Sequence, residues 1–120
     1  MNIVENIALI KEVHNHLETS VAQDEAISYL KKIGLSNIAK FRISQCSEVE
    51  IFYVMIIRAL MTKEKSIVIV RPFAITHFLI DIKTIIDTIL VLNNNKNIFI
   101  LDLIVNEAEY KKEDRCNIIK

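Results

Sequence analysis

The chain contains very little glycine, proline and cysteine. Its 120 residues include one glycine, one proline, two cysteines and no tryptophan. A single glycine excludes a glycine-rich phosphate-binding loop, because such loops need several glycines for backbone N–H groups to converge on phosphate oxygens. Cys46 and Cys116 have no metal-ligand spacing, so we expect two reduced core thiols instead of a disulfide or a metal site.

The chain also lacks an excess of charge of either sign and any long apolar run. Its 15 basic and 15 acidic residues give a formal net charge of zero, whereas nucleic-acid binding requires a concentrated basic face. The longest apolar runs, 51–57 and 98–101, are much shorter than the about 20 residues of a membrane-spanning helix. The start shows no basic region followed by an apolar core, as a signal peptide would. We therefore expect one cytoplasmic domain at 1–120 that binds no nucleic acid.

Hydrophobic periodicity predicts helices that alternate with strands. The run 67–70, Ile-Val-Ile-Val, lies between a charged turn and Pro72, which is typical of a fully buried parallel strand. Strand–helix–strand order predicts an α/β fold with a parallel sheet of about three strands. A helical or irregular segment is expected at 3–17, and helices are expected at 20–33, 47–62, 77–92 and 106–113. Gly34 would end the second of these segments, and Ser47 with Glu50 three residues on has the capping-box spacing that would open the third. The expected strands cover 66–71, 97–103 and 115–119.

Residues 44–73, SQCSEVEIFYVMIIRALMTKEKSIVIVRPF, resemble the stretch of an ABC transporter ATPase from the signature motif to the Walker B strand. In that family a serine-containing signature loop opens a long helix that ends in Ala-Arg-Ala-Leu. A basic turn follows, and then an apolar strand that ends in Asp-Glu-Pro. Here Arg58, Ala59 and Leu60 stand at the end of the helix, and Pro72 stands where the family has its proline.

The resemblance continues on both sides of this stretch, in the family's order. Residues 1–9, MNIVENIAL, are similar to the segment after the Q-loop in Mla-type phospholipid-transport ATPases and in lipoprotein-release and cell-division ATPases. Residues 97–108, NIFILDLIVNEA, are similar to the strand and H-loop region. The resemblance implies a partial ABC-ATPase-like domain at 1–120. Its helical signature-type region would cover 1–62, and its Walker B to H-loop-like region would cover 63–120.

The residues that act on ATP in this family are replaced or missing. The first residue aligns after the Q-loop, so the P-loop and the Q-loop have no counterpart here. In the signature position stand Cys46, Ser47, Glu48, Val49 and Glu50. Val70 and Arg71 take the places of the Walker B aspartate and glutamate, His77 that of the D-loop aspartate, and Leu103 that of the switch histidine.

These replacements argue against ATP chemistry on physical grounds. Glu48 and Val49 put a negative charge and a branched side chain where two glycines normally approach a triphosphate, and a carboxylate repels phosphate. Val70 and Arg71 can neither bind a hard cation nor accept a proton at neutral pH. We therefore predict a chain that is not an enzyme and that holds no nucleotide, cofactor or metal.

Two polar features allow a sharper and a plainer interpretation. Residues 12–18, EVHNHLE, would place two glutamates and two histidines on one side of a strand as a metal cluster. The helix expected there would scatter them over a solvated surface instead. Arg71 and His77 are either an anion site beside Ser47 or ordinary surface charges.

Phe52 and Tyr53 stand where the signature helix of the family has polar residues. They indicate either a contact with a partner or additional core packing.

The expected function is that of a degenerate ABC-type binding or regulatory subunit. Its partner would be an intact ABC ATPase or the permease of a lipid-transport system. The contact would use the helical region 3–62 and would reach the inner membrane only through the permease. Strands without their usual neighbours also favour a homo-oligomer, because exposed sheet edges pair with other chains. The alternatives are a pseudo-ATPase that lends Ser47 to a partner's composite site, and a truncated remnant without a distinct role.

Overall fold

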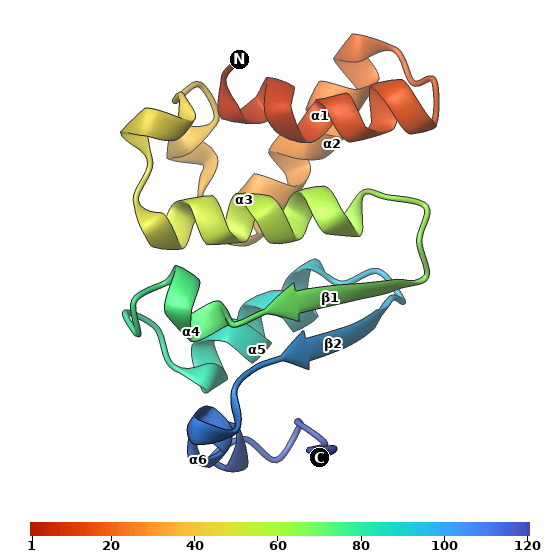
Figure 1. Ribbon diagram of the computed structural model, residues 1–120. Helices are drawn as coiled ribbons and strands as arrows, with labels where there is room; N and C mark the ends of the chain where they lie inside the picture. Colours follow the sequence, from red (N-terminus) through yellow and green to blue (C-terminus); the bar gives the residue numbers. More distant parts are fainter.

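The computed structural model describes residues 1–120 and shows a mixed α/β fold with six α-helices and two strands. The elements are stacked in layers from the N-terminus at one end to the C-terminus at the other (Figure 1). The helices are α1 (Ile3–His14), α2 (Thr19–Lys32), α3 (Glu48–Leu60), α4 (Pro72–Ile75), α5 (Ile82–Leu92) and α6 (Glu107–Lys111), and the strands are β1 (Ser66–Val70) and β2 (Asn97–Leu101). Three 3-10 turns lie at Ser36–Ile38, Ile43–Gln45 and Ile104–Asn106.

Side-chain caps determine where several helices begin. Asn2 accepts a hydrogen bond from the backbone N–H of Glu5, and the Glu5 carboxylate accepts one from the Asn2 N–H, which forms a capping box before α1. Asp81 accepts a hydrogen bond of 2.8 Å from the Thr84 N–H at the start of α5. Gly34 follows α2 with a φ of +72°, a conformation that favours glycine, so the predicted end of this helix is confirmed.

A single core connects the helical half of the chain to the strands. Twenty-three buried hydrophobic residues form one cluster, with members from α1, α2, α3, β1, α4 and α5. Helix α3 lies between the α1–α2 layer and the sheet, so its side chains reach both (Figure 1). The completely buried residues of this core include Ile7, Leu30, Ile57 and Ile85. The helical region 1–62 and the region 63–120 therefore share one hydrophobic core.

The sheet has two strands, so the prediction of about three strands is wrong. β1 and β2 are parallel, with Ile67 opposite Ile98 and Ile69 opposite Ile100. The segment 115–119 has no strand partner. Ion pairs from Arg115 to Asp87 and from Lys120 to Glu107 hold this segment at both ends, away from the ladder.

The expected helix 77–92 is also corrected, because it begins only at Ile82. Pro72 starts the short helix α4 instead, as a residue with fixed φ can at a first helical position. His77 and Phe78 then have φ values of 52° and 56°, and this left-handed backbone interrupts helical structure before Asp81.

β1 is buried on one face only, which corrects the expectation of a fully buried strand. Ile67 and Ile69 are buried, whereas Val68 and Val70 are more than half exposed. Helix α5 lies behind the sheet, and the front of the two strands is uncovered in Figure 1. The cause is that the chain places a helix on one side of the strands alone, so only every second side chain enters the core.

Candidate functional site

The signature-type residues form the cap of α3. The Ser47 hydroxyl accepts a hydrogen bond of 3.2 Å from the Glu50 N–H, and the Glu50 carboxylate accepts one of 2.8 Å from the Ser47 N–H. This capping box was predicted from the spacing of the two residues and is confirmed. Val49 packs against the core, and the Cys46 thiol lies 3.5 Å from the Arg42 carbonyl oxygen. The Ser47 and Glu50 side chains thus bond to the first turn of their own helix.

Glu48 and His77 are brought together from distant positions in the sequence. The Glu48 Oε2 atom lies 2.5 Å from the His77 Nδ1 atom, and both side chains are more than half exposed. The imidazole is therefore engaged by a carboxylate, and a carboxylate at this place repels an anion. This contact argues against an anion site formed by Arg71 and His77 beside Ser47.

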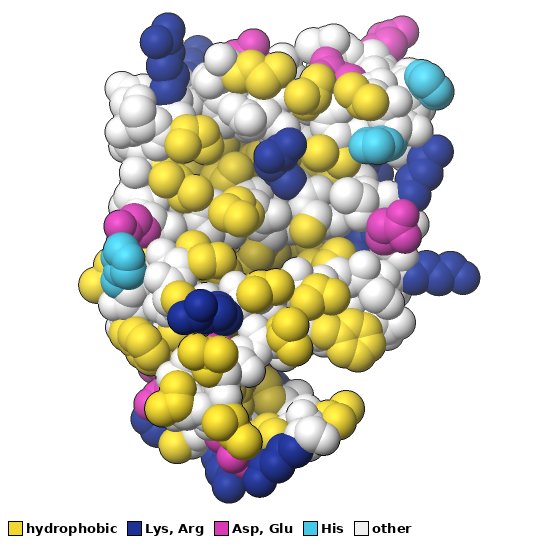
Figure 2. Space-filling view, in the orientation of Figure 1, with side chains coloured by type: hydrophobic (Ala, Val, Ile, Leu, Met, Phe, Trp, Pro, Cys, Tyr) yellow, Lys and Arg dark blue, Asp and Glu magenta, His cyan; other side chains and the backbone are white.

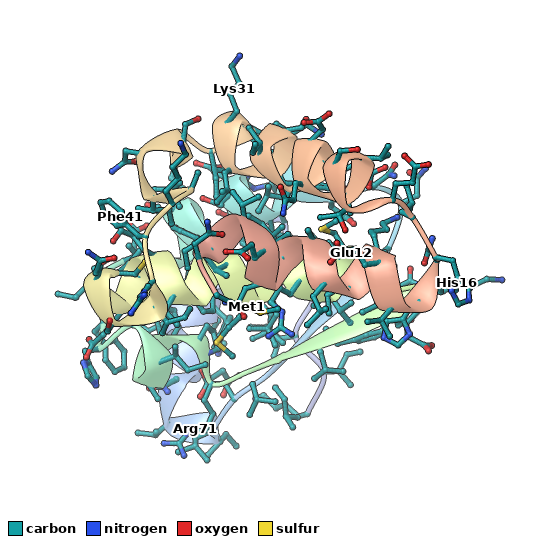
Figure 3. All side chains as sticks on the ribbon, turned by 90° about the horizontal axis from the view of Figure 1, so that it is seen from above. Met1, Glu12, His16, Lys31, Phe41 and Arg71 are labelled. Carbon is teal, nitrogen blue, oxygen red and sulfur yellow. The ribbon has the colours of Figure 1, made fainter.

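The Walker B-like and H-loop-like positions meet at the carboxyl end of the sheet. Arg71 adopts a left-handed conformation with φ 49° and donates its N–H to the Leu101 carbonyl oxygen at 2.8 Å. Val70 and Leu103, which precede and follow this contact, are both about half exposed to solvent. Figure 3 shows Arg71 at the margin of the molecule, away from the helical layers. Val70, Leu103 and Arg71 therefore offer two aliphatic side chains and one cation, none of which can bind a metal ion as a carboxylate would.

Asp102 is the carboxylate at this end of the sheet, and sequence reasoning missed it. It accepts hydrogen bonds from the Tyr110 hydroxyl at 2.5 Å, the Asn106 amide at 3.0 Å and the Leu103 N–H at 2.7 Å. Burial alone would raise the pKa of Asp102, but these hydrogen bonds outweigh burial and lower it. Burial and the contact with Asp102 raise the pKa of Tyr110. These hydrogen bonds hold α6 against the end of β2, so Asp102 stabilises the fold.

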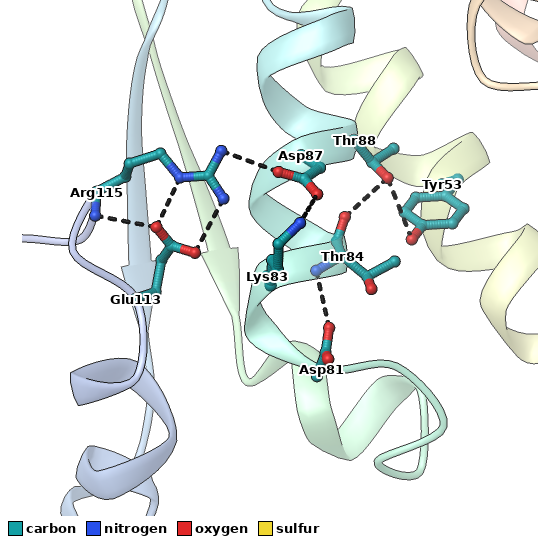
Figure 4. Close-up of polar contacts among 8 residues, drawn as sticks. All are labelled: Tyr53, Asp81, Lys83, Thr84, Asp87, Thr88, Glu113 and Arg115. Carbon is teal, nitrogen blue, oxygen red and sulfur yellow. Dashed lines mark hydrogen bonds and ion pairs between the residues drawn. The ribbon is translucent and has the colours of Figure 1, made fainter.

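A second polar network joins α5 to the C-terminal segment (Figure 4). The Arg115 guanidinium lies 2.6 Å from Glu113 and 2.9 Å from Asp87, and Asp87 also pairs with Lys83 at 2.9 Å. Hydrogen bonds from the Arg115 side chain and backbone lower the pKa of Glu113 to about 2. Hydrogen bonds from Lys83 and Arg115 lower the pKa of Asp87. No sequence motif marks this network, because its members are brought together by the fold.

Acid is expected to destabilise the chain through these carboxylates. A folded-state pKa below the unfolded value stabilises the fold above the unfolded pKa, and this stability is lost as pH falls toward the folded pKa. The free energy of unfolding should therefore be constant between about pH 5 and about pH 8 and should decrease from about pH 4.5 to about pH 2. Urea unfolding at a series of pH values measures this. The pKa is lowered for Asp81, Asp87, Asp102, Glu107 and Glu113.

A pair of variants identifies the contribution of the Arg115 network. Arg115→Met should make the acid-dependent decrease smaller, because Glu113 then titrates closer to its ordinary pKa. Lys63→Met, which removes an exposed lysine in the turn before β1, serves as the matched control and should leave the pH profile unchanged. Equal profiles for Arg115→Met and the unaltered chain would contradict the assignment.

Phe52 and Tyr53 lie in the core, so the partner contact expected at these residues is corrected. Phe52 is 1% exposed and Tyr53 is 8% exposed. Their rings pack with centroids 5.5 Å apart. The Tyr53 hydroxyl accepts a hydrogen bond of 3.4 Å from Thr88 on α5 (Figure 4). The two aromatic side chains are buried here because this face of α3 is covered by α5 and the strands.

The histidines and glutamates of segment 12–18 do not assemble. Glu12 and His14 belong to α1, and His16 follows the helix with a φ of 55°. Figure 3 places Glu12 on the body of α1 and His16 at the far end of that helix. No group of three or more His, Cys, Asp or Glu side chains is arranged to hold a metal ion. The free thiols Cys46 and Cys116 are half-buried and form no disulfide.

A cavity of about 610 Å³ lies between α5, the outer side of β2 and the C-terminal segment. Its walls are mainly aliphatic, with Ile89, Ile98 and Ile118 among them, and Glu107 and Lys120 are at its rim. These two side chains pair with each other at 2.9 Å. The cavity contains none of the signature-like or Walker B-like positions. None of the helices has both the length and the apolar character that crossing a bilayer requires.

The comparisons with known proteins give no family for this chain. Its sequence matches no protein-family model, and a search of curated proteins finds no match either. What the chain can do is therefore argued from its own residues and their arrangement.

Proposed function

We propose that the chain is a catalytically inactive, ABC-ATPase-like binding subunit of a lipid-transport system. Its partner in this proposal is an intact ABC ATPase or the membrane permease. The proposal combines the sequence resemblance with one structural observation: the polar groups of the signature-type loop are consumed by the chain itself. Ser47 and Glu50 cap α3, and Glu48 pairs with His77.

The polar groups of the signature-type loop are bonded within the chain, which supports the proposal that the chain does not hydrolyse ATP. A signature loop that acts on a nucleotide needs free donors, whereas the backbone N–H groups of Ser47 and Glu50 both donate within the capping box. The Glu48 carboxylate beside it would repel the phosphates. At the end of β1, an exposed Val70 and a left-handed Arg71 leave no carboxylate for magnesium or for the attacking water.

The partner contact is assigned to the outer surface of the helical region 3–62. This region presents large apolar side chains to solvent, and such side chains form the centres of protein interfaces. They come from each of its helices and from the turn before α3. They are Val13, Val21, Ile27, Ile43 and Met55.

Titration with Mg-ATP is the first test. Isothermal titration calorimetry of the full chain should give no binding heat with Mg-ATP at concentrations up to about 1 mM, which corresponds to less than about 4 kcal/mol of binding free energy. A dissociation constant in the micromolar range would refute the inactive assignment. The positive result expected is co-purification of the chain with a co-expressed ABC ATPase or permease.

Two matched cap variants separate this function from a composite-site pseudo-ATPase. Ser47→Ala and Asn2→Ala each remove a capping box, so each should lower the free energy of unfolding by about 1 kcal/mol. A chain that lends Ser47 to a partner's nucleotide would lose its stimulation of the partner's ATPase rate in Ser47→Ala alone. The binding subunit proposed here should show no rate difference between the two variants.

A further inference from the structure

The uncovered side of the sheet carries a contiguous group of apolar side chains, here called the bare sheet face. It consists of Val68 and Val70 from β1 and Phe99 and Leu101 from β2. Their exposures are 60%, 51%, 53% and 63%. The parallel register sets Val68 opposite Phe99 and Val70 opposite Leu101, so the four side chains form one block.

The opposite side of the same sheet is covered, and this contrast is unusual for parallel strands. Parallel sheets are normally covered on both faces. Here α5 covers one face and nothing covers the other (Figure 1). Figure 2 looks onto the bare sheet face and shows hydrophobic side chains over the strands and below them. Neither strand contains a charged residue, so burying this face desolvates no ion.

The bare sheet face has both a projection and a hollow. Phe99 projects into solvent from β2, while a hollow of about 280 Å³ lies beside β1. All the residues around the hollow are hydrophobic, and Met55 of α3 is one of the exposed ones. They are Phe52, Met55, Ile56, Ala59, Val68, Ile69, Val70 and Ile75.

We propose that a second copy of this chain covers the bare sheet face in a two-fold symmetric dimer. In an isologous contact, residue i of one copy meets residue j of the other, and j meets i. Phe99 of each copy would enter the hollow of its partner, next to Met55 and Val68. The two sheets would then be packed face to face at the ordinary spacing of about 10 Å.

The apolar area is sufficient for a dimer of moderate strength. With about 100 Å² for a fully exposed aliphatic side chain and about 200 Å² for phenylalanine, the bare sheet face and Met55 expose roughly 300 Å² per copy. Because interfaces are about 60% apolar, the dimer would bury about 1,000 Å² in total.

The charge balance favours a second copy as the occupant. The formal net charge of the chain is zero, so two copies approach each other without the repulsion that keeps strongly charged proteins monomeric. A second copy also brings the same uncharged apolar strands, which match the bare sheet face in chemistry. This contact shares only Met55 with the surface assigned to an ATPase or permease, so the exposed side chains of α1 and α2 remain available for that partner in the dimer.

Sedimentation equilibrium from about 1 to about 200 μM tests the dimer, since this range brackets a micromolar dissociation constant. The mass should rise from the 13.9 kDa of one chain to twice that value. Phe99→Asp should raise the dissociation constant at least about 100-fold, because it buries an unpaired charge in each half of the contact. Val91→Asp, at a site on α5 with 54% exposure, is the matched control and should leave it unchanged.

Methionine oxidation gives a second readout that uses the unaltered chain. Peroxide should oxidise Met55 more slowly at high protein concentration, whereas the oxidation of Met1, which is 65% exposed, should not change. A monomer at all concentrations would overturn the proposal, and so would an assembly that Phe99→Asp leaves intact. If Phe99→Asp is monomeric but still co-purifies with the transporter partner, both proposals hold. If the unaltered chain forms the dimer but does not co-purify with a transporter partner, only the proposed function is contradicted.

Discussion

Replacing Phe52 with alanine is expected to lower the free energy of unfolding by about 3–5 kcal/mol. Phe52 is 1% exposed and packs against Tyr53 within the core. The loss combines the transfer free energy of the ring with the cavity that it leaves, because the surrounding helices relax only in part. Urea denaturation followed by far-UV circular dichroism measures the change. Against a typical total stability of about 5–15 kcal/mol, this loss is a large part of the folding free energy.

Met55→Ala on the same helix is the matched control. Met55 is 51% exposed in one copy of the chain, so at protein concentrations that keep the chain monomeric its truncation should cost less than about 1 kcal/mol. If Phe52→Ala were as mild as Met55→Ala, and instead weakened binding to a partner, the core assignment of Phe52 would be wrong. The comparison therefore decides between the two interpretations that the sequence left open at this position.

Ile85→Ala is expected to destabilise the whole chain by about 2–5 kcal/mol. Ile85 is completely buried on α5, and α5 contacts both α2 and α3. Since one core cluster spans the helical region and the strands, the loss should be transmitted to residues 1–62 as well as to 63–120. Native-state hydrogen exchange read by mass spectrometry should show faster exchange in α2 and in β1 by a similar factor.

Leu90→Ala, on the same helix but 55% exposed, is the control for this experiment. It should leave hydrogen exchange in both regions nearly unchanged. If Ile85→Ala accelerates exchange only in residues 63–120, or if urea unfolding shows two separate transitions, the chain has two folding units. The single domain predicted for 1–120 would then be wrong.

The parts of the fold that could be predicted are those with local signals. The spacing of Ser47 and Glu50 indicated the start of α3, and both reciprocal hydrogen bonds are present. Gly34 indicated the end of α2, and the two β-branched runs became the parallel strands β1 and β2. These signals depend on residues within a few positions of one another, so no knowledge of the tertiary structure is needed to interpret them.

The errors concern features that depend on distant contacts. The apolar segment 115–119 looks like a strand, but ion pairs of Arg115 and Lys120 with α5 and α6 hold it away from β2. The pattern from 77 to 92 looks like one helix, but a left-handed backbone at His77 and Phe78 delays the helix until Asp81 caps it. Ion pairs between distant residues produced the first difference and backbone conformation produced the second, and the hydrophobic periodicity reveals neither.

The candidate site also has features that the sequence reveals and features that depend on distant contacts. The residue types at the signature-like and Walker B-like positions are visible in the sequence, and the absence of ATP chemistry that they indicate stays a prediction. The pairing of Glu48 with His77 and the hydrogen bonds around Asp102 were not visible. Both join residues from different elements, so they exist only because the chain folds back on itself.

The sequence by itself determined the start of α3, the end of α2 and the two parallel strands. It did so because caps, turns and residue types act over a few neighbouring positions. Only the tertiary structure decided which side chains are buried. Phe52 entered the core, whereas Val68 and Phe99 stayed in solvent, because α5 covers one face of the sheet and leaves the other bare. Burial is a property of the elements that happen to be packed above a residue, and an alternating strand presents equally apolar side chains to both sides.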